Sequence, residues 1–150
     1  MQLRSFGILL KDVSRLSSRY FERHLGALGL TLDQCKVLAR LEHEQGMTQT
    51  QLAECTDMDP MTLVRVLDRM EQEGLLERRR HEQDRRVRQI YLLPAAQEQM
   101  ERMWQLVERV RGETLCDFSE AEREHFMGYL QRMRSTLHTL LKDDEPAGEA

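Results

Sequence analysis

The feature that most restricts how this chain folds is a pair of closely spaced helix-start signals followed by a helix-stop signal. Thr48 and Gln51 have the spacing of a capping box, which opens a helix. A second start follows at Asp59, which can cap free amides, and Pro60, which suits the first helical position. Gly74 can then adopt the left-handed conformation that ends a helix. A short helix, a tight turn and a second capped helix predict a helix-turn-helix unit.

The second helix of this unit has two different faces. Leu63, Leu67 and Met70 follow the spacing of a buried stripe. The opposite face carries Met61, Thr62, Val64, Arg65, Asp68 and Arg69. Arginines in the exposed N-terminal half of such a helix can contact base edges or phosphates in the major groove of DNA. They can equally pair with neighbouring acids on a solvated surface, and this helix alone leaves both interpretations open.

After Gly74 the apolar residues alternate as in strands, first from Leu75 and Leu76 and then at Ile90 and Leu92. Residues 78–88, between these strands, hold six arginines and two acids, a local charge of +4 in a chain of net charge −4. A hairpin placed directly after a helix-turn-helix is a wing. An arginine-rich wing tip suits the negative potential of the DNA minor groove, so the pattern favours a polyanion partner.

Apolar residues that recur every three or four positions predict further helices on both sides of this region. One spans residues 5–27, and a shorter helix ends before Gly46. A long helix follows Pro94, and Ser119 with Glu122 forms a capping box that opens a last one. The apolar stripes of these last two helices consist of Ala96, Met100, Met103, Val107 and Val110, and of Phe126, Leu130, Met133, Leu137 and Leu141.

Such long stripes at both ends of a small chain need more partner surface than one winged helix supplies. A two-fold dimer would cover them, and a bundle within one chain is the alternative. We therefore expect one domain over residues 1–150, with dimerisation helices in 1–30 and 95–142. A DNA-binding lobe occupies 31–94, and residues 143–150 form a flexible acidic tail.

Several classes of protein have no support in the sequence. It contains no GxSxG, GxGxxG, P-loop or HExxH motif, and Cys35, Cys55 and Cys116 form neither a CxxC clamp nor an even disulfide set. The sequence has no run of 18 apolar residues, and Lys11 and Asp12 interrupt the short apolar run near its start, so we expect no secretory leader. We expect a cytoplasmic protein without enzymatic activity, cofactor, metal or membrane partner.

Residues 30–93 resemble the MarR family of transcriptional regulators, with the SlyA-like branch as the most similar. The resemblance rests on Leu30-Thr31, Gly46-Met47-Thr48-Gln49, Leu52-Ala53, the run from Leu63 to Glu71, Gly74-Leu75-Leu76 and Asp84-Arg85-Arg86. It implies a mostly helical α+β winged helix-turn-helix fold. It also implies a homodimer that binds pseudo-palindromic double-stranded DNA, with repression as the expected effect.

The family resemblance also assigns residues to DNA contacts. Its Asp-x-Arg wing motif falls on Asp84 and Arg86, with the arginine in the minor groove and the aspartate orienting it. The candidates for DNA binding are Thr48, Gln49, Pro60, Met61, Thr62, Val64, Arg65, Arg69, Arg79, Asp84, Arg85 and Arg86. Val64 stands where the family often has Thr or Ser, and it would meet bases, for example a thymine methyl group.

The sequence departs from the family pattern at two more places. Pro60 and Met61 replace residues that are polar in many relatives, so the target sequence is expected to differ. Leu92-Leu93-Pro94 replaces the usual Leu-Thr before the next helix, where Pro94 partly compensates for the lost threonine cap.

Two kinds of switch and one competing class remain open. Many relatives respond to small aromatic or phenolic effectors bound between the dimer helices and the DNA-binding lobe, for which Tyr20, His24 and Trp104 are candidates. Aromatic residues at helical spacing belong to a core more often. Thiol-based redox sensing is the second family mode. The competing class is a helical dimeric adaptor whose winged helix binds protein.

Overall fold

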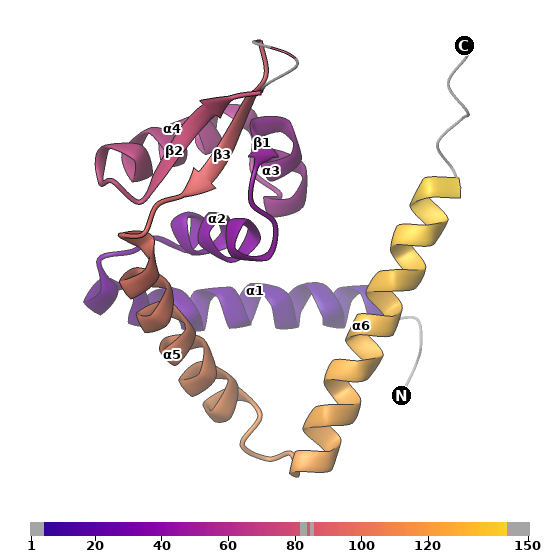
Figure 1. Ribbon diagram of the computed structural model, residues 1–150. Helices are drawn as coiled ribbons and strands as arrows, with labels where there is room; N and C mark the ends of the chain where they lie inside the picture. The colour runs from indigo at the N-terminus through magenta and orange to yellow at the C-terminus, as the bar shows by residue number, and fades with distance from the viewer. Residues whose placement is uncertain (1–4, 82–83, 85, 144–150) are drawn as a thin grey trace. The chain divides into compact units, whose positions relative to one another are not determined.

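The computed structural model describes residues 5–81, 84 and 86–143, apart from the side chains of residues 142 and 143. Arg85 of the predicted wing and residues 144–150 of the predicted tail lie outside the described residues. The chain forms two compact units, residues 1–110 and 111–150, shown in Figure 1.

The structure is mostly helical with one small sheet, which confirms the predicted fold class. The elements in chain order are α1 (Phe6–Leu25), the 3₁₀ helix η2 (Gly26–Leu28), α2 (Leu32–His43), β1 (Met47–Thr48), α3 (Gln49–Thr56), α4 (Pro60–Gln72), β2 (Leu76–Arg80), β3 (Arg88–Leu92), α5 (Ala96–Thr114) and α6 (Glu120–Asp143). Helix α5 begins in the first unit and ends in the second.

The helix-turn-helix forms at the predicted caps. Thr48 Oγ1 accepts the Gln51 N–H at 3.2 Å, and the Gln51 side chain accepts the Thr48 N–H at 2.8 Å. Asp59 Oδ1 accepts the Thr62 N–H at 3.0 Å at the start of α4. Asp57, between α3 and α4, has a left-handed backbone with φ of 55°. These local hydrogen bonds fix where α3 ends and α4 begins, and therefore how the two helices cross.

The predicted hairpin is part of a three-stranded antiparallel sheet of order β1-β3-β2. The strand β1 was not predicted, because two residues are too short to show a periodic pattern. It is anchored by the Gly46 N–H, which donates to the Ile90 carbonyl at 2.9 Å. Gly46 has a φ of +77°, and a Cβ at this position would lie 2.8 Å from the Tyr91 hydroxyl. Only glycine fits this approach without strain.

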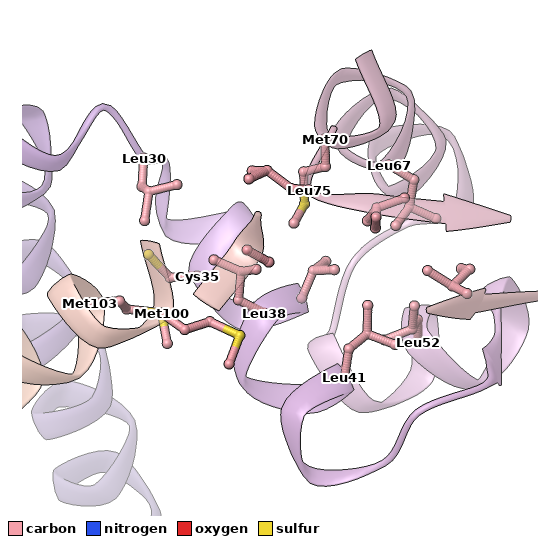
Figure 2. Close-up of a cluster of buried hydrophobic side chains, with 14 of the residues drawn as sticks. Leu30, Cys35, Leu38, Leu41, Leu52, Leu67, Met70, Leu75, Met100 and Met103 are labelled. Carbon is pink, nitrogen blue, oxygen red and sulfur yellow. The ribbon is translucent and has the colours of Figure 1, made fainter. Parts of the chain in front are cut away.

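The core of the first unit lies among α2, α3, α4, the sheet and α5, and Figure 2 shows its central side chains. Leu38, Leu41, Leu52 and Leu67 are fully buried there. The predicted inward face of α4 is confirmed, because Leu63, Leu67 and Met70 are all buried. This packing fixes α4 from its inner side and leaves its outer side open.

The predicted stripe of α5 needs one correction. Val107 is only half-buried, and Leu106 takes its place in the buried set with Met103 and Val110. Leu106 follows Met103 by three positions and precedes Val110 by four, so both helical spacings occur along one stripe.

Two helices keep apolar side chains exposed. In α1 these are Phe6, Ile8, Leu9, Leu10, Val13 and Leu16, and in α6 they are Phe126, Met127, Tyr129, Leu137, Leu140 and Leu141. The predicted capping box before α6 is present, since the Ser119 N–H donates to Glu122 at 2.8 Å. In the part of the chain that the structure describes, no helix has the length and apolar character needed to cross a membrane.

Candidate nucleic-acid interface

The outer face of α4 begins with side chains that contact little else in the chain. Met61, Val64 and Arg65 are exposed. Within the described residues the Arg65 side chain has no hydrogen-bond or ion-pair partner. Thr62 is different, because its Oγ1 donates to Asp59 Oδ2 at 2.5 Å. The hydrogen bonds from the Thr62 side chain and backbone lower the pKa of Asp59, which keeps the cap ionised.

Farther along the same helix the charged side chains are paired. Arg69 Nε donates to Glu73 Oε1 at 2.9 Å, and Gln34 Nε2 donates to Glu73 Oε2 at 3.1 Å. Gln34 is buried in α2, so Glu73 links α2 to α4. The alternative given by the sequence, an arginine that pairs with a neighbouring acid on the surface, therefore describes Arg69 but not Arg65. The Arg69 side chain is still 57% exposed, which leaves its terminal nitrogens accessible.

Arg78 is a structural part of this region that the sequence did not single out. Its side chain is only 10% exposed, although it belongs to the basic run of residues 78–88. Arg78 Nη2 lies 2.6 Å from Asp68 Oδ1, and Nη1 pairs with Glu71. The Arg78 N–H also donates to Glu71 at 3.2 Å. These contacts tie β2 to the outer side of α4 and pair both acids with one guanidinium, which offsets one of their two negative charges.

The stem and tip of the wing hold their arginines differently. The Arg79 guanidinium lies 4.4 Å above the centre of the Tyr91 ring and pairs with Glu77 at 2.5 Å. At the tip, Asp84 Oδ1 accepts the Arg86 N–H at 2.9 Å. Asp84 thus fixes the backbone that carries Arg86, while its expected role of orienting the arginine in DNA stays a prediction.

A hollow of about 390 Å³ lies between the start of α3 and the wing. It is lined by Thr48, Gln49, Thr50, Arg86, Val87 and Arg88. It brings the predicted residues Thr48 and Gln49 together with Arg86, which lies far from them in sequence. Thr50 and Arg88 were not predicted; Arg88 was already visible as the last arginine of the basic run. Arg86 and Arg88 at the N-terminal end of α3 make this hollow suited to a phosphate group.

Comparison with known proteins agrees with this geometry. The model of the MarR family matches residues 30–87. A crystal structure titled transcriptional regulator PA3341 is 30% identical, with a TM-score of 0.74, and the match covers 89% of this chain and 98% of that one. A crystal structure of MarR is 27% identical with a TM-score of 0.82, and the match covers 95% of each chain.

This chain belongs to the MarR family. It is a transcriptional regulator with a winged helix-turn-helix fold and not an enzyme. The HTH-type transcriptional regulator YdgJ of Bacillus subtilis (strain 168) is 26% identical over 131 residues, which cover 87% of this chain and 78% of YdgJ. The assignment to the SlyA-like branch stays a prediction.

The residues considered for an effector of this MarR-family protein do not form one cluster. His24 Nδ1 donates to the Tyr20 carbonyl at 2.9 Å, and the two rings are 4.9 Å apart. Trp104 Nε1 instead donates to Glu42 at 2.7 Å, which links α5 to α2. A hollow of about 290 Å³ is lined by His24, Ala27, Leu28, Arg102, Gln105, Leu106 and Arg109, and neither Tyr20 nor Trp104 is among these residues.

The three cysteines differ in exposure. Cys35 is buried, and burial raises its pKa from 9.0 to about 11. Burial also raises the pKa of the half-buried Cys55. Cys116 is exposed. Since the thiolate is the reactive form, the environments of Cys35 and Cys55 work against thiol chemistry at neutral pH.

Proposed function

We propose that this MarR-family regulator binds specific double-stranded DNA sites as a homodimer and represses transcription. The observation that carries the proposal is the charge arrangement on α4. Asp68, Glu71 and Glu73 are each engaged by an arginine, whereas Arg65 is not engaged by any described residue. Together with the basic run of residues 78–88, the unpaired Arg65 gives this chain of net charge −4 a locally cationic surface for a polyanion.

In this proposal α4 enters the major groove, and the other arginines hold the DNA backbone and minor groove. The side chains of Pro60, Met61, Thr62, Val64 and Arg65 lie at the start of α4 and face base edges, while Arg69 reaches a phosphate. In the wing, Arg86 enters the minor groove on a backbone fixed by Asp84, and Arg79 and Arg85 contact phosphates or the groove edge. The hollow lined by Thr48, Gln49, Thr50 and Arg88 receives a phosphate.

The homodimer is proposed from the exposed apolar side chains of α1 and α6. A second copy of the chain would cover these side chains and remove them from water. In this dimer, residues 1–30 and 95–142 form the dimerisation region, and residues 31–94 form the DNA-binding lobe. A two-fold dimer presents two copies of α4 to a pseudo-palindromic site, with half-sites roughly 34–36 Å apart. Its place of action is then the cytoplasm, on the nucleoid.

A small aromatic acid is the proposed effector. The hollow beside His24 is lined by Arg102 and Arg109, whose charges attract a carboxylate or phenolate, and Tyr20 supports the His24 ring. Trp104 does not line this hollow and has no part in the proposed effector site.

The test is a titration of the full-length protein into two fluorescent duplexes at two salt concentrations. One duplex comes from the region upstream of the protein's own gene, and the other is its scrambled sequence. We expect a preference of about 10³ or more for the native duplex, with steep salt dependence. Arg65→Ala should reduce this preference, whereas Arg40→Ala, the same charge loss on an exposed site of α2 outside the proposed DNA and dimer contacts, should not. Equal, weak binding to both duplexes contradicts the proposal and favours the protein adaptor.

A further inference from the structure

The hydrogen-bonding groups available for base recognition on α4 are few. The Thr62 hydroxyl donates to Asp59 at 2.5 Å, so its proton is already used in the helix cap. Asp68 is held by Arg78 at 2.6 Å, and Arg69 by Glu73 at 2.9 Å. Among the described side chains on the first two turns of α4, this leaves Arg65 as the polar group without a partner.

Two apolar side chains share the face of Arg65. Met61 is 67% exposed and Val64 is 37% exposed. Met61 precedes Val64 by three residues and Arg65 by four, which places all three side chains together on the first two turns of α4. This exposed apolar group lies next to an arginine that has no partner among the described residues. Met61, Val64 and Arg65 together therefore fit a partner that carries negative charge and presents an apolar group beside it.

The major groove of DNA is such a partner. Thymine is the only base that presents a methyl group there, and guanine presents the two acceptors that a guanidinium can bind in a bidentate way. We infer that Met61 and Val64 recognise thymine methyl groups beside a guanine bound by Arg65. Specificity at those positions then comes from burial of the methyl groups. This inference rests on the proposed function and adds the chemistry of the half-site.

The inference is tested by replacing thymine with uracil, which removes the 5-methyl group and leaves the base pairing unchanged. Duplexes are first enriched by the full-length protein from a library with a random centre, and each thymine of the enriched sequence is then replaced in turn. We expect one or two positions per half-site at which uracil weakens binding by about fourfold, the effect of one methyl-sized group removed from water.

The same duplexes are then titrated with Val64→Ala and Met61→Ala. Each variant should lose the response to uracil at the thymine that it contacts, while its melting temperature stays unchanged because both side chains are exposed. Val66→Ala is the matched control. It makes the same truncation as Val64→Ala at a side chain that packs against the core, so it should keep the full response to uracil.

The possible failures are distinct. If no uracil changes the affinity, or if the response persists in both variants, methyl recognition by Met61 and Val64 is wrong while specific DNA binding stands. If the protein enriches no sequence at all, the proposed function fails and the inference fails with it.

Discussion

The two faces of α4 predict opposite consequences for the same kind of truncation. Leu67 is fully buried on the inner face, and Val64 is 37% exposed on the outer face, three residues away. Leu67→Ala leaves a cavity in the core and should lower the free energy of unfolding by about 2–5 kcal/mol. Val64→Ala removes side-chain atoms that already contact water, and it should change that free energy by less than about 0.5 kcal/mol.

Thermal unfolding measures this difference. For a chain of 150 residues, 1 kcal/mol shifts the melting temperature by about 2–4 °C. A loss of about 3 kcal/mol in Leu67→Ala therefore lowers the melting temperature by roughly 6–12 °C, whereas Val64→Ala stays within about 2 °C of the wild type. Protein concentration must be equal in all samples, because dimerisation raises the apparent stability.

Sequence-specific DNA binding should be affected in the reverse order, more by Val64→Ala than by Leu67→Ala. Well below its melting temperature, Leu67→Ala should keep its preference for the specific duplex, and Val64→Ala should lose part of it. The assignment of the two faces is wrong if Val64→Ala lowers the melting temperature as much as Leu67→Ala, or if Leu67→Ala leaves it unchanged.

Four further predictions concern the arginines and the cysteines. Arg86→Ala should weaken binding to all duplexes alike and reduce the slope of log affinity against log salt by about one; an unchanged slope would remove the wing from the interface. Arg65→Ala should cost about 1–3 kcal/mol of binding free energy on the preferred duplex and much less on random DNA, and equal losses would make it a phosphate contact only. Arg78→Met should lower the free energy of unfolding by about 1–2 kcal/mol in urea denaturation, because it breaks two partly exposed ion pairs, and no change would show that they contribute nothing. Iodoacetamide at neutral pH should label Cys116 well before Cys35, and rapid labelling of Cys35 in the native protein would contradict this. The free energy of unfolding should also fall as the pH rises from 9.0 toward about 11, because the buried Cys35 thiol, whose pKa is raised to about 11, stays protonated where the same thiol ionises in the unfolded chain.

The helix-turn-helix could be predicted because its signals are local. The caps at Thr48 and Asp59 and the stop at Gly74 each act on amides or carbonyls within a few residues, so a short stretch of sequence contains the whole interaction. The buried face of α4 follows from helical periodicity in the same way.

The contacts that the sequence did not predict depend on tertiary structure. Arg78 meets Asp68 and Glu71 only because the chain reverses after α4, and β1 exists only because Met47 pairs with Ile90 of β3. The basic run of residues 78–88 shows the consequence for function. Its arginines look equivalent in sequence, yet the fold buries Arg78 against two acids and leaves others exposed. Composition locates the cationic region, and only packing separates structural arginines from those free to bind.

The most direct test of the central claim is a hydroxyl-radical footprint of the full-length protein on an enriched duplex. Two copies of α4 in adjacent major grooves predict two protected regions whose centres lie about 10–10.5 base pairs apart, with flanking minor-groove protection from the wings. Arg86→Ala should remove the flanking protection and keep the two central regions. A single unbroken protected region, or flanks that Arg86→Ala leaves unchanged, would contradict the account of a two-fold winged-helix regulator.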